Sequence, residues 1–254
     1  MIEDATTGDA GPTAEASRKL ARGSRKLARD MLAVLRVTRG DALPAVTLSW
    51  AQSATGAIAA AGGARAALSG LESLELTHLL RAGHDAILVG IRTVLSDDPL
   101  LSVRLVDGPQ PQPVILDSGL RFPHSARLLS REDRKPWIFH AAGRNPTAME
   151  WAARELSRRG ARLFPVRETA GGLDLVEVLR VLRAEGIRSV LVEGGARVLH
   201  AFLDQGLALQ AIVTVSPSMI EGIPGPGIPA LAECSQVTLG PDTIIWGRLA
   251  RSGP

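Results

Sequence analysis

The chain has 254 residues, 45% hydrophobic but only 3% aromatic and without tyrosine, so its core must consist mainly of Val, Ile, Leu and Ala. The formal net charge of +3 lies in residues 1–40, which hold eight basic and five acidic residues, and the remainder is balanced. The single cysteine, Cys234, excludes an internal disulfide and the paired cysteines of a zinc-deaminase signature. No apolar run approaches the ~18 residues of a membrane span, and the N-terminus lacks a secretory signal, so we expect a cytoplasmic protein.

The N-terminal part differs in composition from the rest. Residues 1–16 are small and polar, which is typical of disorder. Residues 17–37 contain the near repeat SRKLAR and place apolar residues on one helical face, with basic residues on the other. We therefore divide the chain into a disordered to helical basic extension, residues 1–42, and one domain, residues 43–254. A helix packing on the domain, or a loose tail, is favoured over contact with a membrane surface, a nucleic acid or a partner chain.

Short apolar runs and helical patterns alternate in the domain. Residues 69–81 are predicted to form a helix with a Ser69–Glu72 capping box, and one helical turn is predicted at 91–95. The remaining predicted helices are residues 146–159, 174–185 and 196–205. The predicted strands are residues 46–51, 85–90, 113–117, 136–141, 161–166, 188–193, 210–216, 235–240 and 243–249.

This alternation predicts an α/β fold with a mostly parallel, buried sheet, because strands buried on both faces are continuously apolar. The last two strands have no helix between them and predict an antiparallel edge. We expect the Pro/Gly-rich residues 221–229 to form a loop.

The ends of two predicted strands are candidate ligand-binding sites. The predicted strand 188–193 ends at Glu193, and Gly194 and Gly195 follow it before a helix. Such glycines let backbone N–H groups approach a phosphate at the helix N-terminus. The full G-x-G-x-x-G fingerprint is absent, so a plain strand-to-helix turn is equally compatible with the spacing.

The other predicted strand, residues 85–90, ends at Gly90 and is followed by Thr93, Asp97 and Asp98. Ligands of open α/β sheets bind at the carboxyl ends of strands. Two acids before a proline are also typical of a simple turn, and the spacing alone favours that interpretation.

Together, three segments resemble the pyrimidine reductases of riboflavin biosynthesis. They are DAILVGIRTVLSDDPLLSVR (85–104), PVILDS (113–118) and VEGGARVLHAFLDQGL (192–207), and the similarity extends from about Val46 to Leu249. The stretch from AQS at 51–53 to THLLR at 77–81 is more similar to the stand-alone diaminopyrimidine reductases than to the reductase half of bifunctional deaminase–reductases. The missing deaminase signature agrees with the stand-alone branch.

The resemblance implies a dihydrofolate-reductase-like three-layer α/β fold, a homodimer, and NADPH as the cofactor. It also implies that the ribosylamino side chain of a pyrimidine 5′-phosphate is reduced to a ribitylamino chain, by hydride transfer to C1′ of the opened imine. The cofactor carries this step while the protein positions the reactants, and neither a metal nor a side-chain nucleophile is required. The balanced domain lacks the interleaved basic and aromatic residues typical of nucleic-acid binding.

The resemblance also assigns site residues. The positions matching cofactor contacts are Ala51, Gly90, Thr93, Asp97, Ser118, Gly194, Gly195, Ala196, Arg197 and Val198. The positions matching substrate contacts are Arg65, Arg81, Leu101, Arg104 and Glu193. Arginines suit a phosphate, which they bind bidentately, and Glu193 is the catalytic candidate, binding the pyrimidine or relaying a proton. Alternatively, Arg81 only complements a helix dipole, and Arg65 and Arg104 are solvated loop charges. The histidines lack metal-ligand spacing and are interpreted as structural.

The chain departs from the family pattern in several places. Thr55 replaces an acid, Ala57 stands where Lys or Arg is frequent, and Arg92 occupies a position that is usually small. Residues 208–210 and 221–222 also differ from the family's V-D-E and G-G. Two alternatives therefore stay open: a reductase of the same fold acting on a pterin or another pyrimidine, and a non-catalytic NADPH-binding paralogue tethered through its extension. The sequence does not distinguish an aminated from a deaminated pyrimidine.

Overall fold

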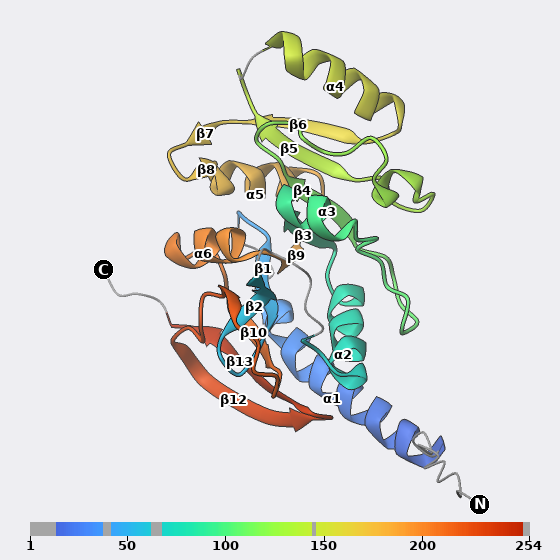
Figure 1. Ribbon diagram of the computed structural model, residues 1–254, viewed down its shortest axis with the longest axis vertical. Helices are drawn as coiled ribbons and strands as arrows, with labels where there is room; N and C mark the ends of the chain where they lie inside the picture. The colour runs from blue at the N-terminus through green and yellow to red at the C-terminus, as the bar shows by residue number, and fades with distance from the viewer. Residues whose placement is uncertain (1–13, 38–41, 62–67, 144–145, 251–254) are drawn as a thin grey trace, which may run out of the picture.

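The computed structural model describes residues 14–37, 42–61, 68–143 and 146–250. Arg65 and the first 13 residues, most of the segment predicted to be disordered, lie outside these ranges. A nine-stranded sheet, in the order β12-β13-β10-β1-β9-β3-β4-β5-β6, runs through the molecule (Figure 1). Its strands are β1 (Ala45–Gln52), β3 (Ala86–Gly90), β4 (Gln112–Leu116), β5 (Trp137–Ala141), β6 (Arg162–Val166), β9 (Ser189–Glu193), β10 (Gln210–Val215), β12 (Leu231–Leu239) and β13 (Asp242–Leu249).

The strands from β10 to β6 are parallel, whereas β13 pairs antiparallel with β10 and with β12. The mostly parallel sheet with an antiparallel C-terminal edge is therefore confirmed. Strand β1 lies between β9 and β10, which are distant from it in sequence. Apolar strands buried on both faces need helices on both sides of the sheet.

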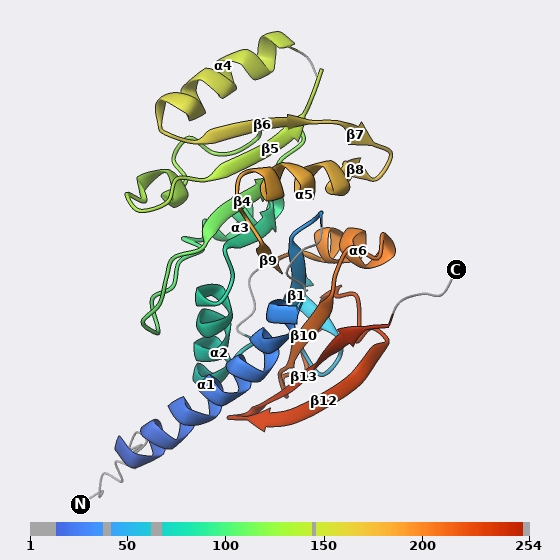
Figure 2. The ribbon, with the colours of Figure 1, turned by 180° about the vertical axis from the view of Figure 1, so that it is seen from behind.

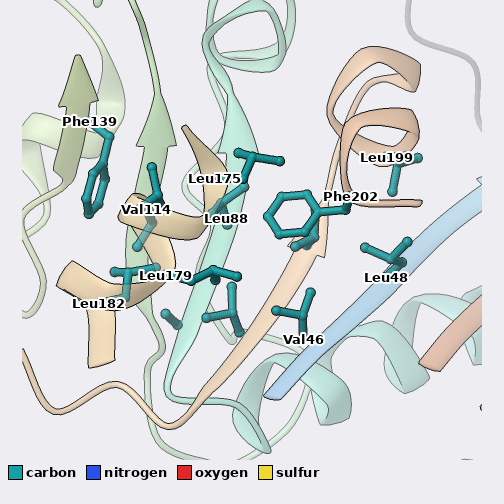
Figure 3. Packing of buried hydrophobic residues seen from close by; sticks show 14 of the residues in the cluster. Val46, Leu48, Leu88, Val114, Phe139, Leu175, Leu179, Leu182, Leu199 and Phe202 are labelled. Carbon is teal, nitrogen blue, oxygen red and sulfur yellow. The ribbon is translucent and has the colours of Figure 1, made fainter. Parts of the chain in front are cut away.

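Helices cover the two faces of the sheet and make three layers (Figures 1 and 2). They are α1 (Ala14–Val37), α2 (Leu71–Ala82), α3 (Ile91–Asp97), α4 (Pro146–Arg158), α5 (Leu175–Ala184) and α6 (Ala196–Asp204), with a short 3-10 helix, η2 (Arg127–Ser130). Successive strand residues point to opposite faces. On one face Val46, Leu48 and Leu88 pack against α5 and α6, where Leu179 and Phe202 are buried (Figure 3). On the other face, Ile87 of β3 packs with α3 and α4, and Leu191 of β9 and Ile212 of β10 pack with α1 and α2.

Helix α1 is part of the core. Leu27 and Met31 are buried against α2 and the sheet, and α1 lies beside α2 in both views (Figures 1 and 2). Leu32 approaches Gly83 so closely that a Cβ at position 83 would overlap it. The side chain of Gln210 donates a hydrogen bond to the Met31 carbonyl at 3.2 Å. Of the interpretations left open for the extension, the structure shows a helix that packs on the domain; the domain boundary at residue 42 stays a prediction.

Two local predictions were wrong. Helix α2 begins at Leu71 with Gly70 as its N-cap, and glycine has no side chain to accept a helix N–H, so the Ser69–Glu72 capping box does not form. The Gly70 N–H instead donates to the Asp242 carboxylate of β13 at 2.8 Å, so a tertiary contact replaces the local one.

The predicted loop at 221–229 contains a strand, β11 (Gly222–Pro224), which pairs with β2 (Ala57–Ala60). No strand was predicted at residues 57–60. A second small ribbon joins β7 (Glu168–Thr169) to β8 (Gly172–Leu173).

Candidate active site

A cavity of about 930 Å³ opens at the carboxyl ends of β1, β3, β4 and β9, beside α6. Ligand sites of open α/β sheets lie at this edge. Its lining includes these residues predicted from the sequence: Ala51, Arg81, Gly90, Thr93, Asp97, Leu101, Ser118, Glu193, Gly194, Gly195, Ala196, Arg197 and Val198. Arg104 is exposed and does not line it, and Arg65 is outside the described residues. Segments far apart in the sequence thus meet in one cleft.

A two-point ion pair forms part of the cleft wall. Arg81, in the last turn of α2, donates from Nε to Oε1 of Glu193 at 2.8 Å and from Nη2 to Oε2 at 2.6 Å. The side chains are only 13% and 17% exposed, so the pair is little screened by solvent. Burial lowers the pKa of Arg81, but the Glu193 carboxylate outweighs it and the pKa is raised above its ordinary value. The guanidinium thereby holds both oxygens of the Glu193 carboxylate through charge-assisted hydrogen bonds.

The glycine turn after β9 leaves room for a ligand. A Cβ at Gly90 would lie 2.8 Å from Cγ2 of Val198, so glycine is needed for α6 to approach β3. Gly195 caps α6 without a side-chain hydrogen bond, and a Cβ built there would meet nothing within 4 Å. The first N–H groups of α6 therefore border open space, and a helix N-terminus favours an anion. These features fit a cofactor phosphate.

The two acids at the end of α3, Asp97 and Asp98, have different surroundings. Asp97 lines the cleft. Asp98 adopts a left-handed conformation with φ of 39° at the C-cap of α3, and its carboxylate accepts the Arg127 N–H at 2.9 Å. The interpretation of the acid pair as a simple turn is therefore correct for Asp98. Asp97 instead lines the cleft, where a ligand can contact it.

Two further arginines line the cleft, Arg92 and Arg121. Arg92 was singled out only as a departure from the family pattern, and Arg121 was missed, although it lies three residues after Ser118 on the loop following β4. Its Nε is 3.8 Å from a carboxylate oxygen of buried Asp117. Burial raises the pKa of Asp117, while Arg121 and nearby backbone N–H groups oppose that rise.

Two buried histidines lie near the site and are structural in their contacts. His78 accepts the Arg104 N–H at Nδ1, at 3.1 Å, and burial, followed by the charges of Arg81 and Arg104, lowers its pKa to about 4. His84 contacts the Leu80 carbonyl and the Thr47 hydroxyl, and burial lowers its pKa to about 4. Both rings are therefore neutral near pH 7.

Thr55, which replaces the family acid, holds a turn. Its hydroxyl donates to the Ile220 carbonyl and lies 2.7 Å from the Ser53 hydroxyl. Ser53 donates to the same carbonyl at 3.0 Å. Thr55 does not line the cavity, so in this chain the position ties the β1–β2 turn to the segment before β11.

The domain matches the model of the RibD C-terminal domain over residues 44–244. The chain belongs to this family. It is 34% identical over 217 residues to the 2,5-diamino-6-ribosylamino-4(3H)-pyrimidinone 5′-phosphate reductase of Methanothermobacter thermautotrophicus, covering 80% of this chain and 96% of that protein. It is 33% identical over 213 residues to the riboflavin biosynthesis protein RibD of Aquifex aeolicus, covering 80% of this chain but only 57% of that protein.

Solved structures of the family share the fold. The riboflavin biosynthesis reductase Rib7 of Saccharomyces cerevisiae matches with a TM-score of 0.68 and 24% identity, covering 87% of this chain and all of that chain. Acinetobacter baumannii RibD matches with a TM-score of 0.71 and 24% identity, covering 88% of this chain and 63% of that chain. The predicted fold class, a three-layer α/β fold with a mostly parallel sheet, is confirmed, and it is the fold of these reductases.

Within the described ranges, no three His, Cys, Asp or Glu side chains gather as a metal site. No helix of that part of the chain is long and apolar enough to cross a membrane.

Proposed function

We propose that the chain is an NADPH-dependent reductase that converts the ribosylamino side chain of a pyrimidine 5′-phosphate into a ribitylamino chain, a step of riboflavin biosynthesis. The observation that carries this proposal is the single cleft in which the open N-terminus of α6 and the Arg81–Glu193 pair lie together. The relative from Methanothermobacter, named for this reductase activity and covered over 96% of its length, supports it.

The cofactor side of the cleft is the turn at Gly194–Gly195 with Thr93, Asp97 and Ser118. The backbone N–H groups at the start of α6 would hold a phosphate. When bound, the nicotinamide supplies the hydride that reduces C1′ of the substrate. Three cleft arginines, Arg92, Arg121 and Arg197, favour NADPH over NADH, because guanidinium groups bind an additional phosphate bidentately.

The substrate side is built around Glu193 and Arg81. Arg81 fixes both carboxylate oxygens of Glu193, so the carboxylate presents its remaining lone pairs in one orientation. We assign Glu193 to accept hydrogen bonds from the pyrimidine and to relay the proton that completes the reduction. Leu101 forms an apolar wall beside it. Arg65 and Arg104 are assigned to the substrate phosphate. For the exposed Arg104 this requires the side chain to turn toward the cleft on binding.

The same proposal includes a homodimer, as the family resemblance implies, and a cytoplasmic location, as expected from the sequence. A sedimentation measurement that gives only monomer at micromolar concentration would refute the dimer without touching the catalytic assignment.

The proposed activity is tested by mixing purified protein with NADPH and the ribosylamino-pyrimidine phosphate, in its aminated and its deaminated form. Absorbance of the reduced nicotinamide is followed, and the product is identified by mass spectrometry as two hydrogens heavier. Substrate-dependent oxidation is expected with one form, and faster with NADPH than with NADH. NADPH binding without oxidation in either form would contradict the proposal and favour the non-catalytic alternative. Oxidation with a pterin instead would favour the alternative substrate.

A further inference from the structure

Leu101, which lines the cleft, belongs to an irregular segment, residues 100–104, that follows α3. Leu101, in this segment, has φ of 49° and is only 3% exposed, with its side chain in the core and in the cavity wall. This left-handed conformation is uncommon for residues other than glycine, and especially for bulky ones. Such a conformation persists only where the surroundings impose it.

Side chains from other elements hold this segment by its backbone. Gln110 binds both backbone groups of Val103: its Oε1 accepts the N–H at 2.8 Å, and its Nε2 donates to the carbonyl at 2.8 Å. The next N–H, of Arg104, donates to Nδ1 of His78 at 3.1 Å. The segment lacks regular secondary structure, so these bonds take the place of a strand ladder.

The central support is Arg131, which follows η2 and whose side chain is 5% exposed. Its Nη1 donates to the carbonyls of Leu100 and Leu101, at 3.1 and 3.3 Å. Its Nη2 lies 3.4 Å from Oε1 of Gln110. Asp133 binds the other edge of the guanidinium, at Nε with 3.0 Å and at Nη2. Only a planar group with five donors can serve all these acceptors at once.

The segment in turn orients the ion pair of the site. The carbonyl of Ser102, the residue after Leu101, accepts Nη1 of Arg81 at 3.1 Å. The other two donating nitrogens of Arg81 bind Glu193. A shift of the segment would therefore move both the Leu101 wall and the guanidinium that fixes Glu193.

We propose that Arg131 is a positioning residue for the substrate side of the cleft. Arg131 does not line the cavity; it acts through the Leu100 and Leu101 carbonyls on the wall and on the Arg81–Glu193 pair. The proposal rests on the proposed function, because it takes this side of the cleft to bind the pyrimidine phosphate.

The test compares the wild-type protein with the variants Arg131→Met and Arg131→Lys, below their unfolding temperatures. Arg131→Met is expected to raise KM for the pyrimidine phosphate about tenfold or more, since a 1.4 kcal/mol loss of binding is a factor of ten. We expect kcat to change less than threefold, because Glu193 itself is retained. We expect the Kd for NADPH to change less than twofold, because Thr93, Asp97, Ser118 and the turn at Gly194–Gly195 lie outside residues 100–104. Arg131→Lys keeps the charge but lacks the planar, multiply donating guanidinium, so we expect a KM between those of the wild type and Arg131→Met.

Arg162→Met is the matched control. Arg162 also forms a two-point pair, with Glu185 at 2.9 Å through both Nη atoms, and neither residue lines the cleft. Its KM is expected to equal that of the wild type. If Arg131→Met does not fold, Asp133→Asn replaces it, because it weakens the anchor of the guanidinium without removing it; a rise in KM of about threefold is then expected.

Amide hydrogen exchange of the peptide spanning 100–105 gives a readout independent of turnover. Faster exchange in Arg131→Met, together with the raised KM, supports the proposal. A wild-type KM overturns it, even if the variant unfolds at a lower temperature or exchanges faster, because Arg131 would then be only structural. If the wild-type protein itself does not turn over, the proposed function has failed. The Kd of the pyrimidine phosphate then replaces KM: a raised Kd in Arg131→Met together with faster exchange supports the positioning role, and an unchanged Kd, or no binding by the wild type, overturns it.

Discussion

The pair formed by Arg81 and Glu193 gives the sharpest prediction. In Glu193→Gln the amide keeps one acceptor for Arg81 and places an NH₂ group where the second carboxylate oxygen accepted Nε or Nη2. One charge-assisted hydrogen bond is thereby lost, a contribution of about 1.5–3 kcal/mol. Both side chains are less than a fifth exposed, so this interaction is only weakly screened. We take about 2 kcal/mol as the cost.

This magnitude sets two expected outcomes. A loss of about 2 kcal/mol of unfolding free energy lowers the Tm by roughly 4–8 °C for a chain of this size. If the same carboxylate binds the pyrimidine in the transition state, kcat/KM falls by about 30-fold or more, since each 1.36 kcal/mol is tenfold. Thermal unfolding and the NADPH oxidation assay measure the two effects, and a double-mutant cycle with Arg81→Met isolates the coupling between the partners.

Glu185→Gln is the matched control, because Glu185 forms a similar two-point pair with Arg162 outside the cleft. The partners are 32% and 50% exposed, and exposed pairs contribute about 0–1 kcal/mol. We expect a small change in Tm and none in kcat/KM. If Glu193→Gln kept kcat/KM within twofold of the wild type, the assignment of Glu193 to the substrate would be wrong, whatever the Tm.

Three other perturbations follow from the structure. Gly90→Ala places a methyl group 2.8 Å from Val198 and should displace the start of α6, weakening NADPH binding in a fluorescence titration by about tenfold; unchanged affinity would show that α6 adjusts freely. Met31→Ala, at a side chain with no exposed surface in α1, should lower the free energy of unfolding by about 2–5 kcal/mol, and a loss below 1 kcal/mol in urea would mean that α1 is not part of the core. Because the folded pKa of His84 is lowered from 6.5 to about 4, its unfolded state binds the proton first. Its contribution to stability is therefore complete above pH 6.5 and declines as the pH falls from 6.5 towards 4. In urea unfolding at pH 7 and pH 5, His84→Gln should show a smaller difference than the wild type, and an equal difference would refute this assignment.

Much of the architecture could be predicted from the sequence because its signals are local. Strands such as β3, β4 and β9 each contain a short apolar run, and the first four residues of each are buried. Both faces of these strands are covered, so the pattern can be recognised in consecutive residues. The turn after Glu193 was predicted in the same way, because two glycines between an apolar strand and a helix are typical of a tight strand-to-helix turn. The prediction of Gly90 and Thr93 beside this turn came from the family resemblance, and the structure places both in the same cleft.

What only the tertiary structure decided depends on residues that meet from distant parts of the chain. Asp97 and Asp98 are equivalent in sequence, but the contact with Arg127 assigns Asp98 to the turn and leaves Asp97 at the cleft. The helix start at Leu71 is set by Asp242, 172 residues beyond Gly70, against a local capping signal. The support of Leu101 by Arg131 has no sequence signature, because a buried guanidinium is recognised only by the carbonyls it binds. Periodicity fixes which residues are buried, and only the pairing of distant segments fixes what each buried polar group contacts.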